Sequence, residues 1–229
     1  MRVDVWSDVV CPWCAIGRAH LGTALSQFEH GAEVTVRWRS FELDPSAPRR
    51  RPGEYAALLA AKYGTDRATA QAMIDRMADR AAAAGLEFHL ERAQPGNTFD
   101  AHRILHLAAD AGIADAVGSR LFAAYLAEGE AIGERSVLAR LAASSGLDAD
   151  AVGAVLETDR YADAVRADER EAGELGVSGV PFFLVDGRFA VAGAQPPEII
   201  ADTLRRAWTR RQMVTVAGDG PACGPGGCS

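Results

Sequence analysis

The chain has 229 residues, and its shares of 48% hydrophobic and 24% charged residues are typical of a soluble globular protein with a buried core. The formal net charge of −7 argues against nucleic acid as the main partner. No stretch approaches the ~20 apolar residues that cross a bilayer, and the first residues lack the pattern of a signal peptide. We therefore expect a cytoplasmic protein that does not bind membranes.

The N-terminal residues predict a β-α-β unit. Arg2–Ser7 alternates polar and apolar residues, as strands do, and Cys11–Phe28 carries apolar residues close to helical spacing. Pro12 suits the first turn of that helix, because its missing N–H costs nothing there. Val34–Phe41 alternates again and predicts the second strand.

Residues 53–176 are rich in alanine, and their apolar residues recur at three- and four-residue steps. Asp148 is a natural N-cap, and Gly112 and Gly146 stand where helices should end. The predicted helices are Glu54–Tyr63, Asp66–Ala84, Thr98–Ala111, Ala114–Glu128, Ser136–Ser145, Ala149–Glu157 and Tyr161–Leu175. We expect this block to be an all-helical unit.

Strand character returns at Pro181–Val185 and at Phe189–Ala192, and Asp186-Gly187 between them is a tight-turn signal. A last helix opens at Pro197. The order is therefore β-α-β, a helical insertion and β-β-α. The two flanking pieces form one sheet only if the chain returns after the insertion.

This order predicts an α/β protein with a thioredoxin-like fold and a large all-helical insertion. Residues 1–52 and 177–212 would form the discontinuous thioredoxin-like domain, and residues 53–176 the insertion domain. Residues 213–229 would form a flexible C-terminal tail that carries a cysteine pair.

The four cysteines form two close pairs, Cys11/Cys14 and Cys223/Cys228, which favours thiol chemistry or a metal over structural disulfides. Cys11 and Cys14 stand at a strand-to-helix junction, where the helix N-terminus favours the thiolate of the first cysteine. We therefore expect Cys11 to attack a substrate disulfide and Cys14 to open the resulting mixed disulfide.

A metal site is the alternative for this pair. Zinc ribbons also use Cys-x-x-Cys, but their second pair normally follows ~15–20 residues later, whereas the next cysteine here is Cys223. His102 and His106 lie four residues apart on a predicted helix, a spacing that can bind a metal. No acidic or thiolate partner lies near them in the sequence, so we expect no bound metal.

Five groups of residues between positions 7 and 195 follow the order of one known family. They are Ser7-Asp8 with Cys11-Pro12-Trp13-Cys14 and Ile16-Gly17; Trp38-Arg39 with Phe41-Glu42-Leu43 and Pro45; Asn97-Thr98 with Ala101-His102-Arg103; Gly176-Val177 with Gly179-Val180-Pro181; and Gly193-Ala194-Gln195. In these groups the chain resembles the DsbA-like thioredoxin family, in particular its FrnE-type branch of cytosolic oxidoreductases. Related hydroxychromene-carboxylate isomerases and kappa-class glutathione transferases typically carry serine in place of Cys11. Ala15 stands where the branch often has an aromatic residue.

The resemblance implies that Pro12 and Trp13 shape the active-site turn and that the Val180–Pro181 bond is cis beside it. By base rate alone the bond would be trans, since only ~5–6% of such bonds are cis. The exposed backbone of Val180 would then pair with a substrate peptide by strand addition.

Two further features are open to more than one interpretation. Some FrnE-type members resemble this chain in a C-terminal cysteine pair, which implies that Cys223 and Cys228 exchange with the first pair; inert thiols or a metal clip are the alternatives. In the glutathione-using relatives, the segment of Asn97, His102 and Arg103 faces the active-site cleft. We favour an N-cap and a helix with two satisfied polar side chains.

Three functions follow. The leading one is an enzyme that reduces, isomerises or forms disulfides in proteins or peptides, with no bound cofactor and a thiol reductant such as glutathione or thioredoxin. The second is a glutathione-dependent isomerase or transferase in which Cys11 activates a small thiol. The third is a non-enzymatic protein that binds metal or thiols through its cysteines.

Overall fold

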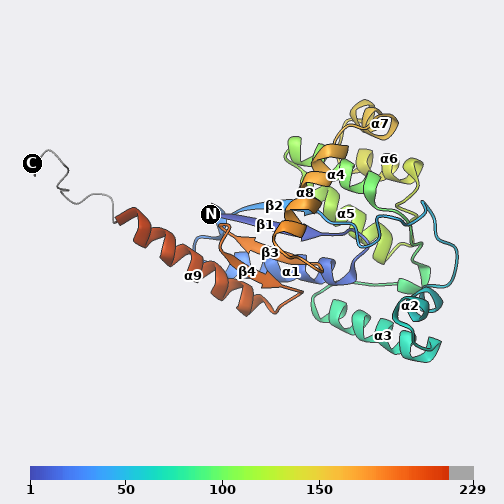
Figure 1. Ribbon diagram of the computed structural model, residues 1–229, viewed down its shortest axis with the longest axis horizontal. Coiled ribbons are helices and arrows are strands. Elements are labelled where there is room, and N and C mark those ends of the chain that lie inside the picture. Colours follow the sequence, from blue (N-terminus) through green and yellow to red (C-terminus); the bar gives the residue numbers. More distant parts are fainter. Residues whose placement is uncertain (217–229) are drawn as a thin grey trace, which may run out of the picture.

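The computed structural model of the chain describes the backbone of residues 1–216 and the side chains of residues 1–212 (Figure 1). Its elements are β1 (Arg2–Ser7), α1 (Pro12–Gln27), β2 (Thr35–Ser40), α2 (Tyr55–Tyr63), α3 (Arg67–Ala83), α4 (Phe99–Asp110), α5 (Ala114–Leu126), α6 (Arg135–Ser144), α7 (Ala149–Glu157), α8 (Ala162–Glu174), β3 (Phe182–Val185), β4 (Phe189–Ala192) and α9 (Pro197–Val216). Each predicted strand and helix is confirmed to within two residues at the predicted ends. Short 3-10 helices at Gly31–Glu33 and Leu90–Arg92 were not predicted.

One four-stranded sheet, in the order β2-β1-β3-β4, joins the segments before and after the helical block. β1 and β2 run parallel, as a β-α-β unit requires, whereas β3 is antiparallel to both β1 and β4. Val5 pairs with Trp38 on one side and with Phe183 on the other. The chain thus returns after its helices to pair with its own first strand, and the α/β, thioredoxin-like prediction is confirmed.

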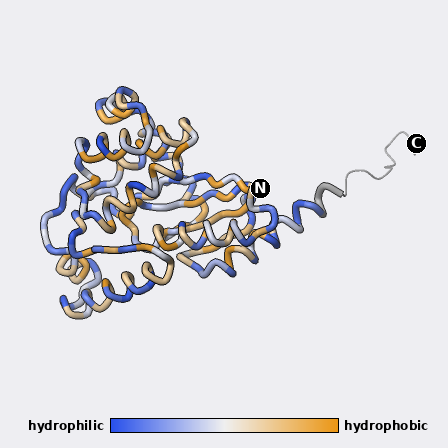
Figure 2. Tube along the Cα trace, turned by 180° about the vertical axis from the view of Figure 1, so that it is seen from behind, coloured by the Kyte–Doolittle hydropathy of each residue, from blue (hydrophilic) through white to orange (hydrophobic). Residues whose placement is uncertain are grey.

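The side chains of β1 alternate between two covered faces of the sheet. Val3 and Val5 belong to a hydrophobic core formed with α1 and α9 on one face. Asp4 and Trp6 turn to the other face, where α8 lies and the indole N–H of Trp6 donates to the carbonyl of Asp168 at 2.9 Å. Figure 2 shows hydrophobic stretches along the strands between these helical layers.

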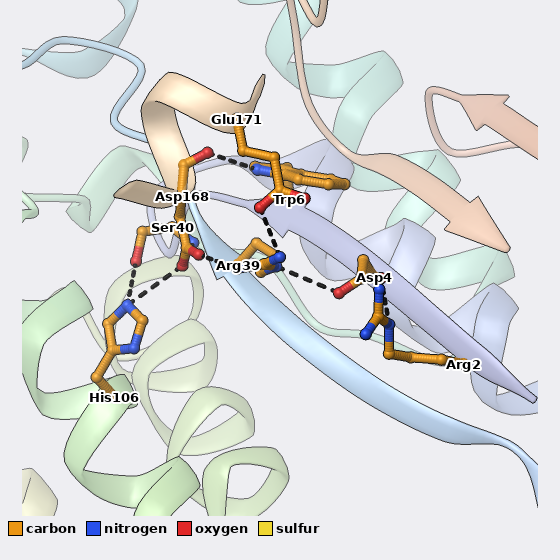
Figure 3. Close-up of polar contacts among 8 residues, drawn as sticks. All are labelled: Arg2, Asp4, Trp6, Arg39, Ser40, His106, Asp168 and Glu171. Atoms are coloured by element: carbon orange, nitrogen blue, oxygen red, sulfur yellow. Dashed lines mark hydrogen bonds and ion pairs between the residues drawn. The ribbon is translucent and has the colours of Figure 1, made fainter. Parts of the chain in front are cut away.

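A buried charge network fastens α8 to the sheet (Figure 3). Arg39 of β2 lies 3.2 Å from a carboxylate oxygen of Asp4 on β1. The same guanidinium pairs with Asp168 and, at 2.6 Å, with Glu171, both on α8. Three elements that are distant in sequence therefore meet at one side chain.

Asp168 is the carboxylate that receives most contacts in this network. It accepts a hydrogen bond from the Ser40 N–H at 2.9 Å, and it lies 3.2 Å from Nε2 of His106 on α4. Burial alone would raise the pKa of Asp168, but His106, the Ser40 N–H and the charge of Arg39 together lower it. The contacts thus keep this buried group ionised.

The helices α4 to α7 form a second hydrophobic core that extends to the cysteine turn. Ile104, Leu121 and Leu138 belong to it, together with Cys11 and Cys14 from the start of α1. The helical block therefore packs against the end of the sheet unit that carries the cysteines. The prediction assigned α8 to the insertion, whereas this helix lies on the sheet. The domain division at residue 176 stays a prediction.

The last helix, α9, continues to Val216, so the predicted start of the tail at residue 213 is wrong. No glycine or proline interrupts the sequence between Pro197 and Gly218, and nothing therefore ends the helix earlier. Neither α9 nor any other helix within residues 1–216 is long and apolar enough to cross a membrane. Cys223 and Cys228 lie outside the described residues, and their role stays a prediction.

Replacing Asp168 with asparagine should lower the free energy of unfolding at pH 7 by about 3–5 kcal/mol, because Arg39 is left buried without its main partner. A carboxyl whose pKa is lowered by folding stabilises the fold above its unfolded pKa of ~3.9, and that stabilisation is lost as the pH falls through the folded value. Urea unfolding of both proteins should therefore show a difference that shrinks below pH ~4.

Asp163→Asn is the matched control, since Asp163 is an exposed residue of the same helix. It should change the unfolding free energy by less than about 0.5 kcal/mol. An Asp168→Asn effect as small as that of the control would contradict the role of the network.

Candidate active site

Cys11 and Cys14 are brought together by the turn that joins β1 to α1. Cys11 is the N-cap residue of α1, and its backbone N–H donates to the carbonyl of Asp8 at 3.0 Å. The N–H of Cys14 donates to the carbonyl of Cys11 at 3.0 Å. Both residues are free thiols, and their side chains interact directly. One helical turn therefore holds two sulfurs within reach of each other.

Cys14 is the inner residue of the pair and is 1% exposed. Burial raises the pKa of its thiol well above the usual value, and the neighbouring Cys11 raises it further. The backbone N–H of Asp8 and the side chain of Ser7 offset only part of this increase. Cys14 is thus held as a neutral thiol, which suits a residue that acts after Cys11.

The helix N-terminus supports the sulfur of Cys11 without a direct hydrogen bond. As the N-cap residue, Cys11 has no side-chain bond to an N–H of α1, and Pro12 at the first helical position has no N–H to offer. Apart from the helix dipole, the contact that α1 makes with this sulfur is therefore the side chain of Cys14.

The loop before β3 faces Cys11 across the end of the sheet. The Val180–Pro181 peptide bond is cis, and Sγ of Cys11 lies 3.8 Å from the carbonyl oxygen of Val180. Pro181 also packs on Gly17 of α1, where an added Cβ would lie 2.8 Å from the proline Cγ. Because only glycine allows this close approach, Gly17 sets the spacing between the loop and the cysteine helix.

Cys11 is 4% exposed, and it lies on the wall of a cavity of about 310 Å³ between the cysteine turn and the helical block. The lining is mainly apolar and aromatic, and it includes Trp13, Leu43, Tyr55, Leu59, Met77 and Tyr125. The loop residue Val180 completes the wall beside the sulfur. The helical block therefore shapes the space in front of Cys11.

Four charged side chains also line this cavity: Asp8, Asp44, Arg51 and Lys62. Arg51 is paired with Asp44 at 2.6 Å. Lys62, the one lysine of the chain, forms no ion pair with any residue of the described segment. Lys62 is therefore the positively charged side chain of this cavity that is available to pair with a negatively charged ligand.

Behind the cysteine turn, buried ionisable groups surround His102 of α4. Its Nε2 lies 3.5 Å from Oδ1 of Asp8, without a well-aligned hydrogen bond. Burial alone would lower the pKa of His102, but Asp8, Glu42 and Glu169 outweigh it and raise the value overall. Arg166 pairs with Glu42 at 2.6 Å and balances part of the negative charge.

The contacts of Asn97 and Arg103 support their interpretation as structural residues. Oδ1 of Asn97 accepts the N–H of Phe99 at 2.9 Å and so caps the start of α4, whereas Thr98 makes no capping bond. Arg103 is buried and donates to backbone carbonyls at the end of α7. Neither side chain lines the cavity at Cys11.

His102 and His106 do not share a site. His102 turns toward Asp8, whereas Nε2 of His106 lies 3.2 Å from Oγ of Ser40 on the other side. Within the described part of the chain, no three or more His, Cys, Asp or Glu side chains are grouped so that they could hold a metal ion.

Sequence reasoning gave no active-site role to Asp8, Tyr55 or Tyr125. Asp8 carries a local signal, because it lies three residues before Cys11 on the same turn. The tyrosines come from α2 and α5, and helical periodicity indicates only that each lies on an apolar face. Their position at the cavity follows from tertiary packing alone.

A cysteine pair at the start of a helix, set on a thioredoxin-like sheet, defines the class of thiol–disulfide oxidoreductases. The chain belongs to the family described as the DSBA-like thioredoxin domain, whose family model matches residues 2–205.

Individual relatives agree with this assignment. The crystal structure of a probable DsbA oxidoreductase, SCO1869 from Streptomyces coelicolor, is 41% identical with a TM-score of 0.87 and covers 100% of this chain and 98% of that chain. YwbO of Bacillus subtilis (strain 168), an uncharacterized protein, is 29% identical over 202 residues, 87% of this chain and 93% of its own length. The cytosolic disulfide reductase DsbM from Pseudomonas aeruginosa with GSH shares the fold, with a TM-score of 0.60 at 19% identity over 94% of this chain and 100% of that chain.

Gly17→Ala should slow disulfide exchange by roughly tenfold, because the added Cβ pushes against Pro181 and displaces the loop beside Cys11. Overpacking of this kind should also lower the free energy of unfolding by about 1–3 kcal/mol. Insulin reduction and urea unfolding measure the two effects.

Gly22→Ala is the matched control in the same helix, since an added Cβ there meets nothing within 4 Å. It should leave the exchange rate unchanged and stabilise the protein by roughly 0.5–1 kcal/mol. Equal behaviour of the two variants would show that the contact between Gly17 and Pro181 does not position the loop.

Proposed function

We propose that this protein is a FrnE-type thiol–disulfide oxidoreductase that acts in the cytoplasm on disulfides of proteins or peptides through Cys11 and Cys14. One observation carries the proposal: Cys11 lies on the cavity wall, and Cys14 lies buried behind it on the same turn. A two-step exchange needs a nucleophile that the substrate reaches and a resolving thiol that it does not.

In the proposed reaction, the thiolate of Cys11 attacks one sulfur of the substrate disulfide. A bond between Cys11 and the substrate forms as the substrate S–S bond breaks, and the other substrate sulfur leaves as a thiolate. Cys14 then loses its proton and attacks the sulfur of Cys11, which releases the second substrate thiolate. A thiol reductant such as glutathione or thioredoxin returns the pair to the dithiol, and the reverse sequence oxidises a substrate.

Pro12, Trp13, Val180 and Pro181 are proposed to support this chemistry. Pro12 constrains the turn between the two cysteines, and Trp13 offers a partly exposed aromatic surface beside Cys11. An extended peptide along residues 179–181 would add to the end of β3 through backbone hydrogen bonds and would present its sulfur to Cys11. The 3.8 Å contact between Cys11 and the Val180 carbonyl supports this orientation.

Cys11→Ser should abolish the reduction of insulin, because the attacking sulfur is lost. Cys14→Ser should instead trap a mixed disulfide between Cys11 and the substrate, since the resolving thiol is missing. Mass spectrometry of the trapped adduct, before and after addition of dithiothreitol, identifies the bond.

Both variants are best made with Cys223 and Cys228 replaced by serine, so that no other thiol of the chain resolves the adduct. The protein with only these two replacements is the control. Insulin reduction that survives Cys11→Ser would refute the proposed nucleophile.

The cavity favours a second candidate function, a glutathione-dependent isomerase or transferase. Cys11 opens into a space of about 310 Å³, which suits a small thiol better than a folded protein. Lys62 on its wall offers a cation to a carboxylate. DsbM, which has the same fold, was solved with GSH. In this function Cys11 would orient and activate the bound thiol without forming a lasting disulfide with Cys14.

If an anionic thiol such as glutathione binds this cavity, Lys62→Glu should raise its KM by roughly three- to tenfold, since a charge reversal at a solvated wall costs about 1 kcal/mol. Steady-state kinetics with glutathione at two salt concentrations measure the effect, which should weaken at high salt.

Arg188→Glu makes the same charge change in the exposed turn between β3 and β4, away from the cavity, and should leave the KM unchanged. An equal rise in both variants would assign the effect to net charge and not to Lys62.

A further inference from the structure

Two tyrosines of the helical block, one buried and one partly buried, reach the cavity that Cys11 lines. Tyr55 comes from α2 and Tyr125 from α5, and both line the same space as the cysteine. Tyr125 is 2% exposed, and Tyr55 packs against the core that includes Cys11. Within the described residues, neither hydroxyl forms a hydrogen bond with another residue. Two polar O–H groups thus stand in a largely apolar cavity, open to a ligand.

The opposite wall supplies few donors for a negatively charged sulfur. Sγ of Cys11 contacts the carbonyl of Val180 at 3.8 Å, and a carbonyl accepts hydrogen bonds and cannot donate one. The N–H groups of α1 give the sulfur no capping hydrogen bond, Pro12 has no N–H, and the thiol of Cys14 lies on the buried side of the pair. Charge that develops on a substrate sulfur inside the cavity therefore needs a donor from the helical block.

We propose that Tyr55 is a catalytic residue of the exchange, whose hydroxyl donates a hydrogen bond to the sulfur that leaves the substrate when Cys11 attacks. This inference rests on the proposed function of Cys11 and adds a residue to it. Of the two tyrosines, Tyr55 is only partly buried, whereas Tyr125 is 2% exposed. Tyr55 is thus the one that a ligand in the cavity reaches more readily.

The position of Tyr55 suits a hydrogen bond to the leaving sulfur better than one to the sulfur of Cys11. No hydrogen bond joins Tyr55 to Cys11, so the hydroxyl lies beyond direct reach of that sulfur. A substrate disulfide extends about 2.05 Å from its attacked sulfur to its leaving sulfur. Because the attack is in line, the leaving sulfur lies on the far side of the attacked sulfur from Cys11, in the cavity that Tyr55 also lines.

The proposed step balances without a further reactant. The Cys11–sulfur bond forms, the substrate S–S bond breaks, and its electron pair moves to the leaving sulfur, which carries away the negative charge. Burial, then the charge of Cys11, raise the pKa of Tyr55 to about 12, so the hydroxyl keeps its proton and acts as a donor and not as a base. Water then protonates the released thiolate.

Tyr55→Phe tests the hydroxyl while it keeps the ring, and Tyr161→Phe is the matched control, since Tyr161 does not line the cavity. Two uncharged probes separate the effects: 4,4′-dithiodipyridine, whose leaving group needs little stabilisation, and bis(2-hydroxyethyl) disulfide, whose alkyl thiolate needs much. Tyr55→Phe should slow attack on the alkyl probe by roughly ten- to a hundredfold, because a hydrogen bond to a charged group is lost. Attack on the pyridyl probe should change by less than about twofold, and Tyr161→Phe should change neither rate by more than that.

Alkylation of Cys11 by iodoacetamide releases iodide and reports the nucleophile alone, so its rate should be the same in Tyr55→Phe and the unmodified protein. Equal slowing of both disulfide probes in Tyr55→Phe, or no slowing of the alkyl probe, would overturn the proposal. So would a Tyr161→Phe effect as large as that of Tyr55→Phe.

The unmodified protein provides a test that does not depend on the folding of a variant. Its rates of reaction with a series of small uncharged disulfides should depend less steeply on the pKa of the leaving thiol than the rates of 2-mercaptoethanol with the same disulfides. A slope equal to that of the free thiol would overturn the role of Tyr55 and leave Cys11 as the nucleophile. A protein that reacts with none of the disulfides would remove the proposed function, and this inference with it.

Discussion

The pairing of Arg39 with Asp168 is the interaction on which the position of the active-site loop depends. The chain leaves the sheet after β2 and returns only at β3, and α8 is the last element before that return. By holding α8 on the sheet, Arg39 anchors the element from which the chain runs through Val180 and Pro181 to β3. A buried pair of this kind is costly unless all its partners are present, and net stabilities of only about 5–15 kcal/mol leave little reserve for its loss.

The same network shows what the sequence pattern could and could not predict. Alternation along β1 correctly predicted a strand, and it separates Val3 and Val5 from Asp4 and Trp6. It gives no sign that Asp4 is buried, because a period of two assigns a side chain to a face and says nothing about what covers that face. The covering element here is α8, whose carboxylate at Asp168 lies far away in the sequence. That Asp4 and Asp168 are both buried became apparent only when the structure showed α8 on the sheet, with both carboxylates paired to Arg39.

The candidate site likewise has one part that local sequence predicts and one part that depends on long-range packing. The proximity of Cys11 and Cys14 follows from their spacing at a helix start, which is a local property and was read from the sequence. The cavity depends on how α2 and α5 pack over that turn. Periodicity predicts that Tyr55 and Tyr125 lie on apolar helix faces, yet the cavity that both faces border is a property of the assembled helices. Of the residues that line the cavity, sequence reasoning therefore identified Trp13 and Val180 and missed those of the helical block.

This division also locates selectivity in the helical block. The sheet unit contributes the sulfur pair and the loop at Val180, but the surface of Cys11 is almost entirely enclosed. A disulfide held inside a folded domain cannot enter a space of about 310 Å³ unless a flexible segment carries it there. Leu43 and Tyr63, two of the large apolar side chains that remain exposed, line this same cavity and would contact such a segment. Under the proposed function, the helical block would therefore restrict exchange at Cys11 to small or extended substrates, while the sheet unit would supply the reacting sulfurs.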